Sequence, residues 1–259
     1  MKSKLLIIIG LQLAVISCND QVKYEEIISD LILNISETFP NNGVSNPELT
    51  FEIETAEIYP CVNYQIALHT SLKDGHLRIN ILGTSIDGIC YTALGPATSS
   101  FKLDERVERI TISIDDKVDE YVMTIDESSV RVTPGTSAFS SFDFSTYFRY
   151  PKNSFAFLCG TLVEDSYVCD EFEQFLLGNL SLEKFEFPSE GKVPYPDSSE
   201  GHWYDAPAKY FKYKEADDLS KAGELLKAYY TSNLTNKEGL GMSILGWNNT
   251  HYRNDQRIN

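Results

Sequence analysis

Positive charge is scarce in this chain, and so are the residues that most often hold metals. Lysine and arginine number 22 against 38 aspartates and glutamates, which gives a net charge of −16. Such a surface repels phosphate backbones, so we do not expect nucleic acid as a partner. The sequence contains only 4 histidines and no Cys-x-x-Cys motif, so it predicts neither a zinc site nor a cofactor.

Catalytic motifs are missing as well. The chain has no Gly-x-Ser-x-Gly nucleophile motif, no glycine-rich phosphate loop and no EF-hand loop. Adjacent carboxylates such as Asp115-Asp116 and Asp217-Asp218 are frequent, but turns and helix caps explain most of them. A glycosidase would need two carboxylates roughly 5–9 Å apart in a cleft, which spacing along the chain cannot show. The sequence therefore favours a protein that is not an enzyme.

A long apolar run occurs only at the start of the chain. Lys2 and Lys4 precede a nearly uninterrupted apolar stretch from Leu5 to Val15. That stretch has the length of a signal-peptide core and is too short to span a bilayer as a helix. It ends in Val15-Ile16-Ser17-Cys18, which resembles the lipobox of bacterial lipoproteins.

The lipobox resemblance implies that a signal peptide, residues 1–17, is removed and that Cys18 carries lipid. A diacylglycerol on the Cys18 sulfur and an acylated new N-terminus give lasting anchorage, so the bilayer is the implied partner. The location implied is the bacterial cell envelope, facing the periplasm or the cell surface. Asp20 resembles the inner-membrane retention signal of some enteric bacteria, a rule that does not hold in all lineages, so the choice of membrane stays open. An ordinary secretory peptide and a retained anchor are the alternatives.

Four cysteines remain once Cys18 is assigned to lipid. An oxidising compartment makes disulfides the default for them, and a metal site is the rival. Of the three possible connectivities, we predict the two local pairs, Cys61–Cys90 and Cys159–Cys169. In the chain-entropy model each bond contributes roughly 3–4 kcal/mol.

The chain after the signal peptide is predicted to begin with a short N-terminal segment, which is followed by a β domain. Residues 18–46 are expected to hold the lipidated N-terminus, a short amphipathic helix near Tyr24–Ile35 and a linker rich in Pro, Gly and Asn. From residue 47 to 134, apolar residues alternate with polar ones, as in Leu49, Phe51 and Ile53, and turn signals separate the runs. This pattern predicts an all-β antiparallel sandwich of short strands that is Ig-like in overall arrangement. The Cys-Trp-Cys arrangement of antibody domains is missing from it.

Residues 135–145 are predicted to form a linker, and the spacing of apolar residues along the sequence changes after it. Residues 146–247 are expected to form a smaller α+β domain with helices that begin near Ser166 and near Asp218. The element order of strand, helix, strand, strand, helix and strand fits a ferredoxin-like split βαβ, with plain α+β as the broader prediction. Residues 248–259 read as a polar tail. The predicted fold class is therefore two domains, a sandwich followed by an α+β unit.

A loop at residues 188–207, rich in Pro and Gly, is the best candidate for a binding site. Long structureless loops inside compact domains are uncommon and often functional. The candidate ligand-binding residues are Tyr195, His202, Trp203, Tyr204 and Asp205. Tryptophan and tyrosine faces stack on sugars or cap apolar grooves, and histidine is a common acid–base residue type in binding and catalytic sites. The alternative interpretation is that these aromatics pin the loop to its own sheet.

These features favour three functions, in order. The first is a non-enzymatic envelope lipoprotein that binds an unknown protein or glycan ligand, or that is structural. The second is a carbohydrate-active protein or other hydrolase with its site at the 188–207 loop. The third is an accessory subunit of an envelope protein complex.

Overall fold

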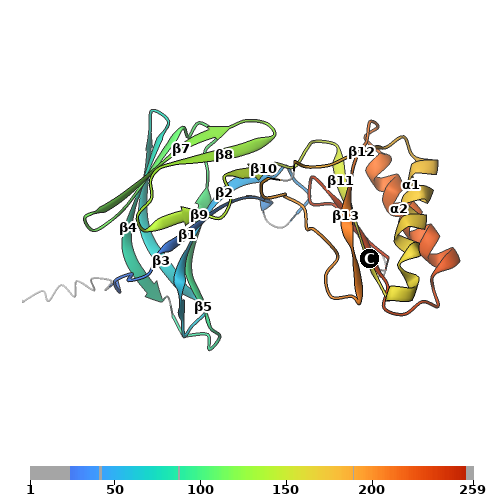
Figure 1. Cartoon of the computed structure of the whole chain (residues 1–259), viewed down its shortest axis with the longest axis horizontal. Helices are drawn as coiled ribbons and strands as arrows, with labels where there is room; N and C mark the ends of the chain where they lie inside the picture. The colour runs from blue at the N-terminus through green and yellow to red at the C-terminus, as the bar shows by residue number, and fades with distance from the viewer. Residues whose placement is uncertain (1–23, 41–42, 87, 189, 255–259) are drawn as a thin grey trace, which may run out of the picture.

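The structure is a computed structural model, and it describes residues 24–40, 43–86, 88–188 and 190–254. Cys18 and the lipobox lie outside the described residues, so the lipid anchor stays a prediction. The described part is mostly β-sheet, arranged as a large curled sheet and a smaller second sheet (Figure 1). Neither of its two α-helices is long and apolar enough to cross a bilayer.

The first half of the chain forms one ten-stranded sheet in the order β10-β8-β7-β6-β4-β3-β5-β2-β1-β9. Its strands are β1 (Leu31–Thr38), β2 (Glu48–Tyr59), β3 (Tyr64–Lys73), β4 (His76–Ile86), β5 (Gly95–Lys102), β6 (Arg109–Ile114), β7 (Lys117–Ile125), β8 (Ser129–Thr136), β9 (Ser140–Phe142) and β10 (Thr146–Phe148). The predicted alternation is confirmed, since buried and exposed residues alternate along β2, β4 and β7.

The expectation of an Ig-like sandwich is not met by this sheet. A sandwich has two separate sheets, whereas here the parallel pairings of β4 with β6 and of β3 with β5 join all ten strands into one ladder. One face is nevertheless apolar throughout, and it curls around a core that includes Phe51, Ile79 and Tyr121. The alternation of apolar and polar residues correctly predicted which face of the strands is buried, but it did not indicate which strands pair.

The predicted helix near Tyr24–Ile35 is wrong, because this segment ends in strand β1. Leu31, Leu33 and Ile35 are buried at every second position, which is the period of a strand. Helical and strand spacings share some of these apolar positions, so the pattern was ambiguous. Pairing with β2 on one side and β9 on the other decides the outcome.

The predicted linker at residues 135–145 also contains structure, and it draws the two edges of the sheet together. β9 pairs in parallel with β1 at one edge, while β10 pairs with β8 at the other. Only residues 143–145 separate β9 from β10, so the two edges lie within about 15 Å of each other. The buried carboxylate of Asp119 on β7 accepts hydrogen bonds from the backbone N–H groups of Ala138, Phe139 and Ser140 and from the Ser140 hydroxyl.

The second sheet has the order β12-β13-β11-β14-β15 and is antiparallel throughout. Its elements are β11 (Ser154–Thr161), α1 (Tyr167–Asn179), β12 (Glu183–Phe185), β13 (Tyr204–Lys212), α2 (Asp218–Asn233), β14 (Gly241–Gly246) and β15 (His251–Arg253). Both helices lie on one face, as Figure 1 shows. The two predicted helices are confirmed, whereas the predicted polar tail is corrected, because β15 extends the sheet beyond residue 247.

Both disulfides that the sequence predicts are present. Cys159 and Cys169, both buried, join β11 to the first turns of α1 beneath the helices. Cys61 and Cys90 join the β2–β3 turn to the β4–β5 loop, with Cα atoms 5.3 Å apart. The Cys61–Cys90 bond therefore links two segments of the first sheet, and the Cys159–Cys169 bond links a strand and a helix of one core. Both agree with the predicted pairing of cysteines that are close in sequence.

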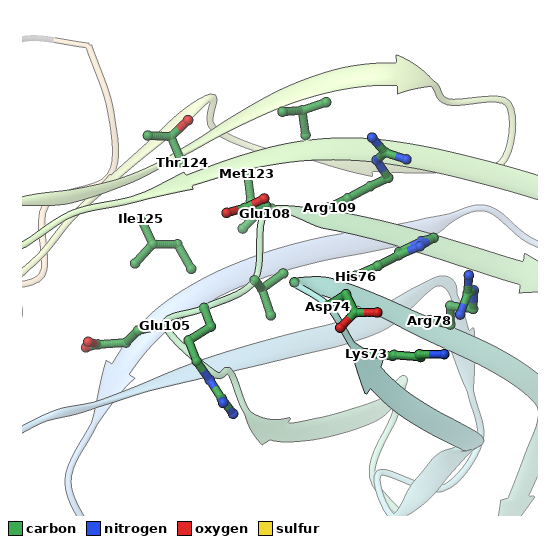
Figure 2. Close-up of a pocket in the computed structure, with 14 residues that line it drawn as sticks. Lys73, Asp74, His76, Arg78, Glu105, Glu108, Arg109, Met123, Thr124 and Ile125 are labelled. Carbon is green, nitrogen blue, oxygen red and sulfur yellow. The ribbon is translucent and has the colours of Figure 1, made fainter.

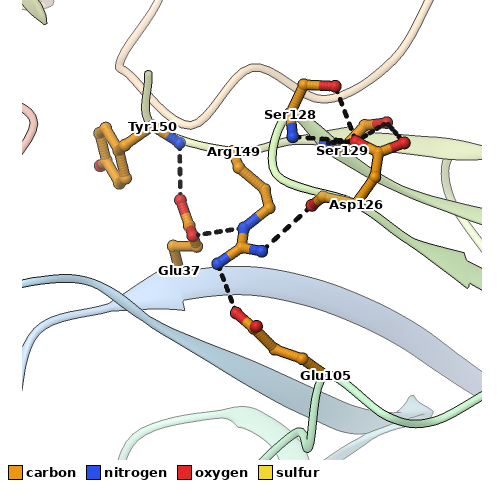
Figure 3. Close-up of polar contacts among 7 residues, drawn as sticks. All are labelled: Glu37, Glu105, Asp126, Ser128, Ser129, Arg149 and Tyr150. Atoms are coloured by element: carbon orange, nitrogen blue, oxygen red, sulfur yellow. Dashed lines mark hydrogen bonds and ion pairs between the residues drawn. The ribbon is translucent and has the colours of Figure 1, made fainter. Parts of the chain in front are cut away.

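Arg149 fixes the start of the connection between the two sheets to the first sheet. It lies just after β10, and its side chain donates to Glu37 on β1 at 2.9 Å, to Glu105 at 2.7 Å and to the Asp126 carbonyl at 3.1 Å (Figure 3). The second carboxylate oxygen of Glu37 accepts the backbone N–H of Tyr150 at 2.6 Å. Because the Glu37 side chain is only 3% exposed, this ion pair is shielded from solvent where the chain leaves the first sheet.

Candidate functional site

The predicted loop is shorter than its sequence suggests. Tyr204 and Asp205 are the first residues of β13, so the irregular segment ends at Trp203. Pro207, which made this stretch resemble a loop, lies in β13 where the register against β11 shifts. Proline is tolerated at such irregular points because no ladder hydrogen bond is needed from it.

Tyr195 is a core residue of this segment. Its side chain is buried, its hydroxyl lies 2.8 Å from the Ser154 hydroxyl, and its ring packs on Tyr150 and Tyr210. Burial raises the pKa of Tyr195 strongly. The ring offers no free face to a ligand, and it holds the segment against the face of the second sheet that the helices leave open.

His202 and Asp205 come together, and Ser199 joins them. The Ser199 hydroxyl donates to Asp205 at 2.8 Å, and the His202 Nδ1 atom lies 3.3 Å from that hydroxyl and 3.2 Å from the carboxylate. Hydrogen bonding, first from Ser199, lowers the pKa of Asp205. A catalytic relay needs the serine and the carboxylate on opposite ring nitrogens, but here both face Nδ1.

The His202 ring also rests on glycine backbone. A Cβ placed on Gly160 would lie 2.3 Å from Nδ1, and one on Gly241 would lie 2.5 Å from Nε2. The imidazole is therefore packed over two neighbouring strands, β11 and β14, where only glycine leaves room for it. This arrangement fits a clasp that holds the loop end to the sheet.

Trp203 and Tyr204 differ in exposure. Trp203 is 83% exposed, which makes it one of the most exposed large apolar residues in the described chain. Tyr204 is 38% exposed and lines a groove of about 640 Å³ at the β12–β13 edge, together with Phe185, Phe187 and Tyr210. Their predicted contact with a ligand stays a prediction.

A further hollow lies on the curled sheet, at a place the sequence did not single out. It has a volume of about 880 Å³ and lies where the β3–β4 hairpin meets β6, β7 and the loop that leads into β6 (Figure 2). The hairpin turn is Asp74-Gly75, with φ values of 51° and 73°. A two-residue turn with both φ values positive sets Lys73 directly opposite His76.

Basic side chains gather on one side of this hollow. The sheet register places Lys73 opposite His76 and His76 opposite Arg109, and Arg78 lies two residues along the same face of β4. Lys73 and Arg109 thus flank His76 from the two neighbouring strands, and a bound anion would offset the repulsion among the cations gathered here. Figure 2 shows Arg109, His76, Arg78 and Lys73 together on the same side of the hollow, with Glu105 at the far end.

The charges around the hollow are unevenly paired. Arg106 binds Asp104, and Glu105 binds Arg149. In the described part of the chain, no carboxylate oxygen lies within 4.0 Å of the charged nitrogens of these three cations: Lys73, Arg78 and Arg109. Asp74 and Glu108 also line the hollow, so its lining is mixed but richer in cations than the chain as a whole.

The pKa of His76 reflects the positive charge of the side chains around it. Its Nε2 atom lies 2.7 Å from the Thr111 hydroxyl. Burial, and then repulsion from Arg78 and Arg109, lowers the pKa of His76, while Glu120 acts weakly in the other direction. The imidazole is thus held towards its neutral form by the same cations that line the hollow.

The sequence held a partial signal for this site. The outward positions of β4 and β6 carry His76, Arg78 and Arg109 in an otherwise acidic chain, but only the parallel β4–β6 pairing brings them together. Comparison of the chain with protein-family models, curated proteins and solved structures gives no match. The functional assignment therefore rests on the geometry of the chain itself.

Proposed function

We propose that this protein is a non-enzymatic lipoprotein of the bacterial cell envelope that binds an anionic ligand in the hollow at the β3–β4 hairpin. The lipobox supports the anchor, and the two disulfides fit an oxidising compartment. The observation that carries the binding role is the group of three cations, Lys73, Arg78 and Arg109, around a hollow of about 880 Å³ in a chain with a net charge of −16.

The hollow suits a ligand with carboxylate or phosphate groups. Its volume of about 880 Å³ falls in the range of small-molecule sites. Guanidinium groups pair with carboxylates and phosphates through two parallel hydrogen bonds, and Arg78 and Arg109 both lie on the rim. Met123, Ile125 and Val122 supply apolar contact surface beside them.

The hydrolase alternative has less support from the geometry. Ser199, His202 and Asp205 converge beside a hollow of about 290 Å³, but the shared nitrogen and the glycine packing of His202 fit a structural clasp. The role of an accessory subunit in an envelope complex stays open. We also infer that the two sheets are separate domains, and that the second is ferredoxin-like, because β13 lies between β12 and β11 while β11 lies between β13 and β14.

Removing the two arginines tests the binding role. The variant Arg78→Ala/Arg109→Ala is expected to bind inositol hexasulfate, a phosphate-like polyanion, at least about tenfold more weakly, since a hydrogen bond to a charged group contributes about 1.5–3 kcal/mol. Isothermal titration calorimetry at low ionic strength measures the effect. The matched control is Lys117→Ala/Lys214→Ala, which removes the same charge from exposed positions outside the hollow. Equal weakening in both variants would show a net-charge effect and contradict a site in the hollow.

Anion binding is expected to strengthen as pH falls. A bound anion offsets the repulsion from Arg78 and Arg109, so the pKa of His76 rises on binding and the complex takes up a proton. If that pKa rises by about half a unit, the affinity for inositol hexasulfate increases about threefold between pH 7 and pH 5. Titrations at the two pH values measure the change. His76→Gln should make the affinity nearly independent of pH, and a pH dependence unchanged in that variant would assign it to another group.

A further inference from the structure

An exposed apolar tip closes one end of the curled sheet. We define the apolar tip as residues 58–63, at the β2–β3 turn, and residues 88–94, at the β4–β5 loop. Its large apolar residues are exposed to solvent: Ile58 57%, Val62 48%, Ile89 83%, Tyr91 65% and Leu94 77%. Surface residues of this kind are normal singly, but a contiguous group marks a contact with another apolar phase.

The apolar tip is also free of charge. The two segments read Ile-Tyr-Pro-Cys-Val-Asn and Gly-Ile-Cys-Tyr-Thr-Ala-Leu, without one charged side chain, in a sequence that is 23% charged. A solvated loop has no need for such a composition. Neutral, apolar and aromatic side chains are what the interface of a bilayer accepts, and tyrosine is enriched there.

The apolar tip is held stiffly in this exposed form. The Cys61–Cys90 disulfide joins its two segments. The Val62 N–H donates to the Tyr91 carbonyl at 3.2 Å, and the Asn63 side chain both donates to the Ile89 carbonyl and accepts the Tyr91 N–H. Ile89, Tyr91 and Leu94 therefore project from a cross-linked frame, and little conformational entropy remains to be lost on contact.

The described chain begins beside this same end of the sheet. Glu25 exchanges two backbone hydrogen bonds of 2.8 Å with Thr84, two residues before the end of β4. Gly83, with a φ of 133°, permits the approach, because a Cβ there would lie 2.4 Å from the Glu25 carbonyl oxygen. Figure 1 shows the start of the described chain next to the lower end of β4. Ile28, 79% exposed, follows directly.

The length of chain before this point limits the distance to the bilayer. Glu25 lies seven positions after Cys18 in the sequence, a separation that spans at most about 25 Å when fully extended. A lipid on Cys18 would therefore keep Thr84, and with it the end of β4 that leads into the apolar tip, close to the membrane surface. His76 and the hollow lie at the opposite end of β4, about 35 Å away along the strand.

We propose that the apolar tip inserts into the interface of the bilayer that holds the anchor. This inference rests on the proposed lipid anchor at Cys18 and deepens it, because it adds a defined orientation to the anchor. Ile89, Tyr91 and Leu94 enter the interface, while the carboxylates of Glu25 and Glu57 remain in water above it. The β3–β4 hairpin then points away from the membrane, and the hollow faces its ligand.

Tryptophan placed at the two ends of the sheet tests the orientation. The acylated full chain is reconstituted in phosphatidylcholine vesicles whose acyl chains carry bromine, which quenches tryptophan on contact. The added fluorescence of Leu94→Trp is expected to fall at least twofold relative to unbrominated vesicles. The matched control is Val122→Trp, an exposed aliphatic position at the level of His76, whose added fluorescence should be unchanged. Both variants need a melting temperature close to that of the parent protein.

The outcomes separate the apolar tip from the anchor. Acyl mass on Cys18 of the mature protein, with equal or no quenching at Leu94→Trp and Val122→Trp, overturns the insertion and leaves the anchor intact. A doubled particle mass without quenching would assign the apolar tip to a second copy of the chain and overturn insertion as well. An unmodified Cys18 in protein from native cells overturns the anchor together with the orientation built on it.

Discussion

Replacing Asp119 by alanine is expected to lower the free energy of unfolding by about 3–5 kcal/mol, because several buried donors lose their acceptor at once. Asp119 is fully buried and accepts four hydrogen bonds from residues 138–140, at 2.6 to 3.1 Å. Those residues carry β9, which pairs with β1 and brings the two edges of the sheet together. Without the carboxylate, three backbone N–H groups at this point have no partner on β7.

Denaturant titration measures the loss, and Asp116→Ala is the matched control. Asp116 is exposed in the β6–β7 turn, so its removal should leave the free energy of unfolding nearly unchanged. Because Asp119 is buried and does not line the hollow, binding of inositol hexasulfate by the folded variant should be retained. A variant at Asp119 as stable as the Asp116 control would show that the edges of the sheet meet without this carboxylate.

Replacing Arg149 by alanine is expected to cost about 3–5 kcal/mol as well, since it leaves a buried carboxylate without its counter-charge. The Arg149 and Glu37 side chains are only 15% and 3% exposed. The pair also lies where the chain passes from the first sheet to the second (Figure 3). All side-chain partners of Arg149 belong to the first half of the chain, so we expect the loss to appear in the unfolding of the first sheet.

The comparison variants for this prediction are Glu37→Gln and Arg106→Ala. Calorimetry on Arg149→Ala, Glu37→Gln and the double variant gives the coupling between the two residues, which should exceed about 1 kcal/mol. Arg106 pairs with Asp104 on the surface, so its removal should leave the melting temperature almost unchanged. An unchanged melting temperature for Arg149→Ala would mean that the buried Glu37 carboxylate does not depend on this partner.

The second sheet was the more predictable half of the fold. Val168, Phe172 and Leu176 recur at helical spacing and are buried in α1, and Gly178 lies in its last turn. The same spacing and burial occur in α2, at Leu219, Ala222 and Leu226. Helix formation depends on the spacing of apolar residues and on the residues at the ends of the helix. Both are local features, so the sequence alone shows them. The element order then left few topologies to consider.

The first sheet was less predictable, because strand pairing depends on residues far apart in sequence. The alternation of Leu49, Phe51 and Ile53 identified a strand and its buried face, but not its neighbours β5 and β1. The short strands β9 and β10 have three residues each, too few for a period to be recognised. Pairing with β1 and β8 makes them strands, which explains why residues 135–145 looked like a linker.

The candidate sites divide in the same way. The 188–207 segment was noticed because of its composition, and the structure separates its members: Tyr195 is buried, His202 and Asp205 form a clasp, and Trp203 is exposed. The hollow at the β3–β4 hairpin was not noticed, because its residues come from three separate segments of the chain. No local pattern reports that Lys73, His76 and Arg109 are neighbours.

The sequence by itself determined the acidic charge, the alternation of buried and exposed residues, both helices and the pairing of four cysteines, because each follows from local spacing or from the small set of possible partners. Only the tertiary structure decided that ten strands form one curled sheet, that its cations meet at a hollow, and that the apolar tip lies beside the start of the described chain. Those features depend on the β4–β6 and β1–β9 pairings and on the approach of Glu25 to Gly83. Hydrogen bonds between residues distant in sequence set them, and a linear pattern does not encode which distant strands will meet.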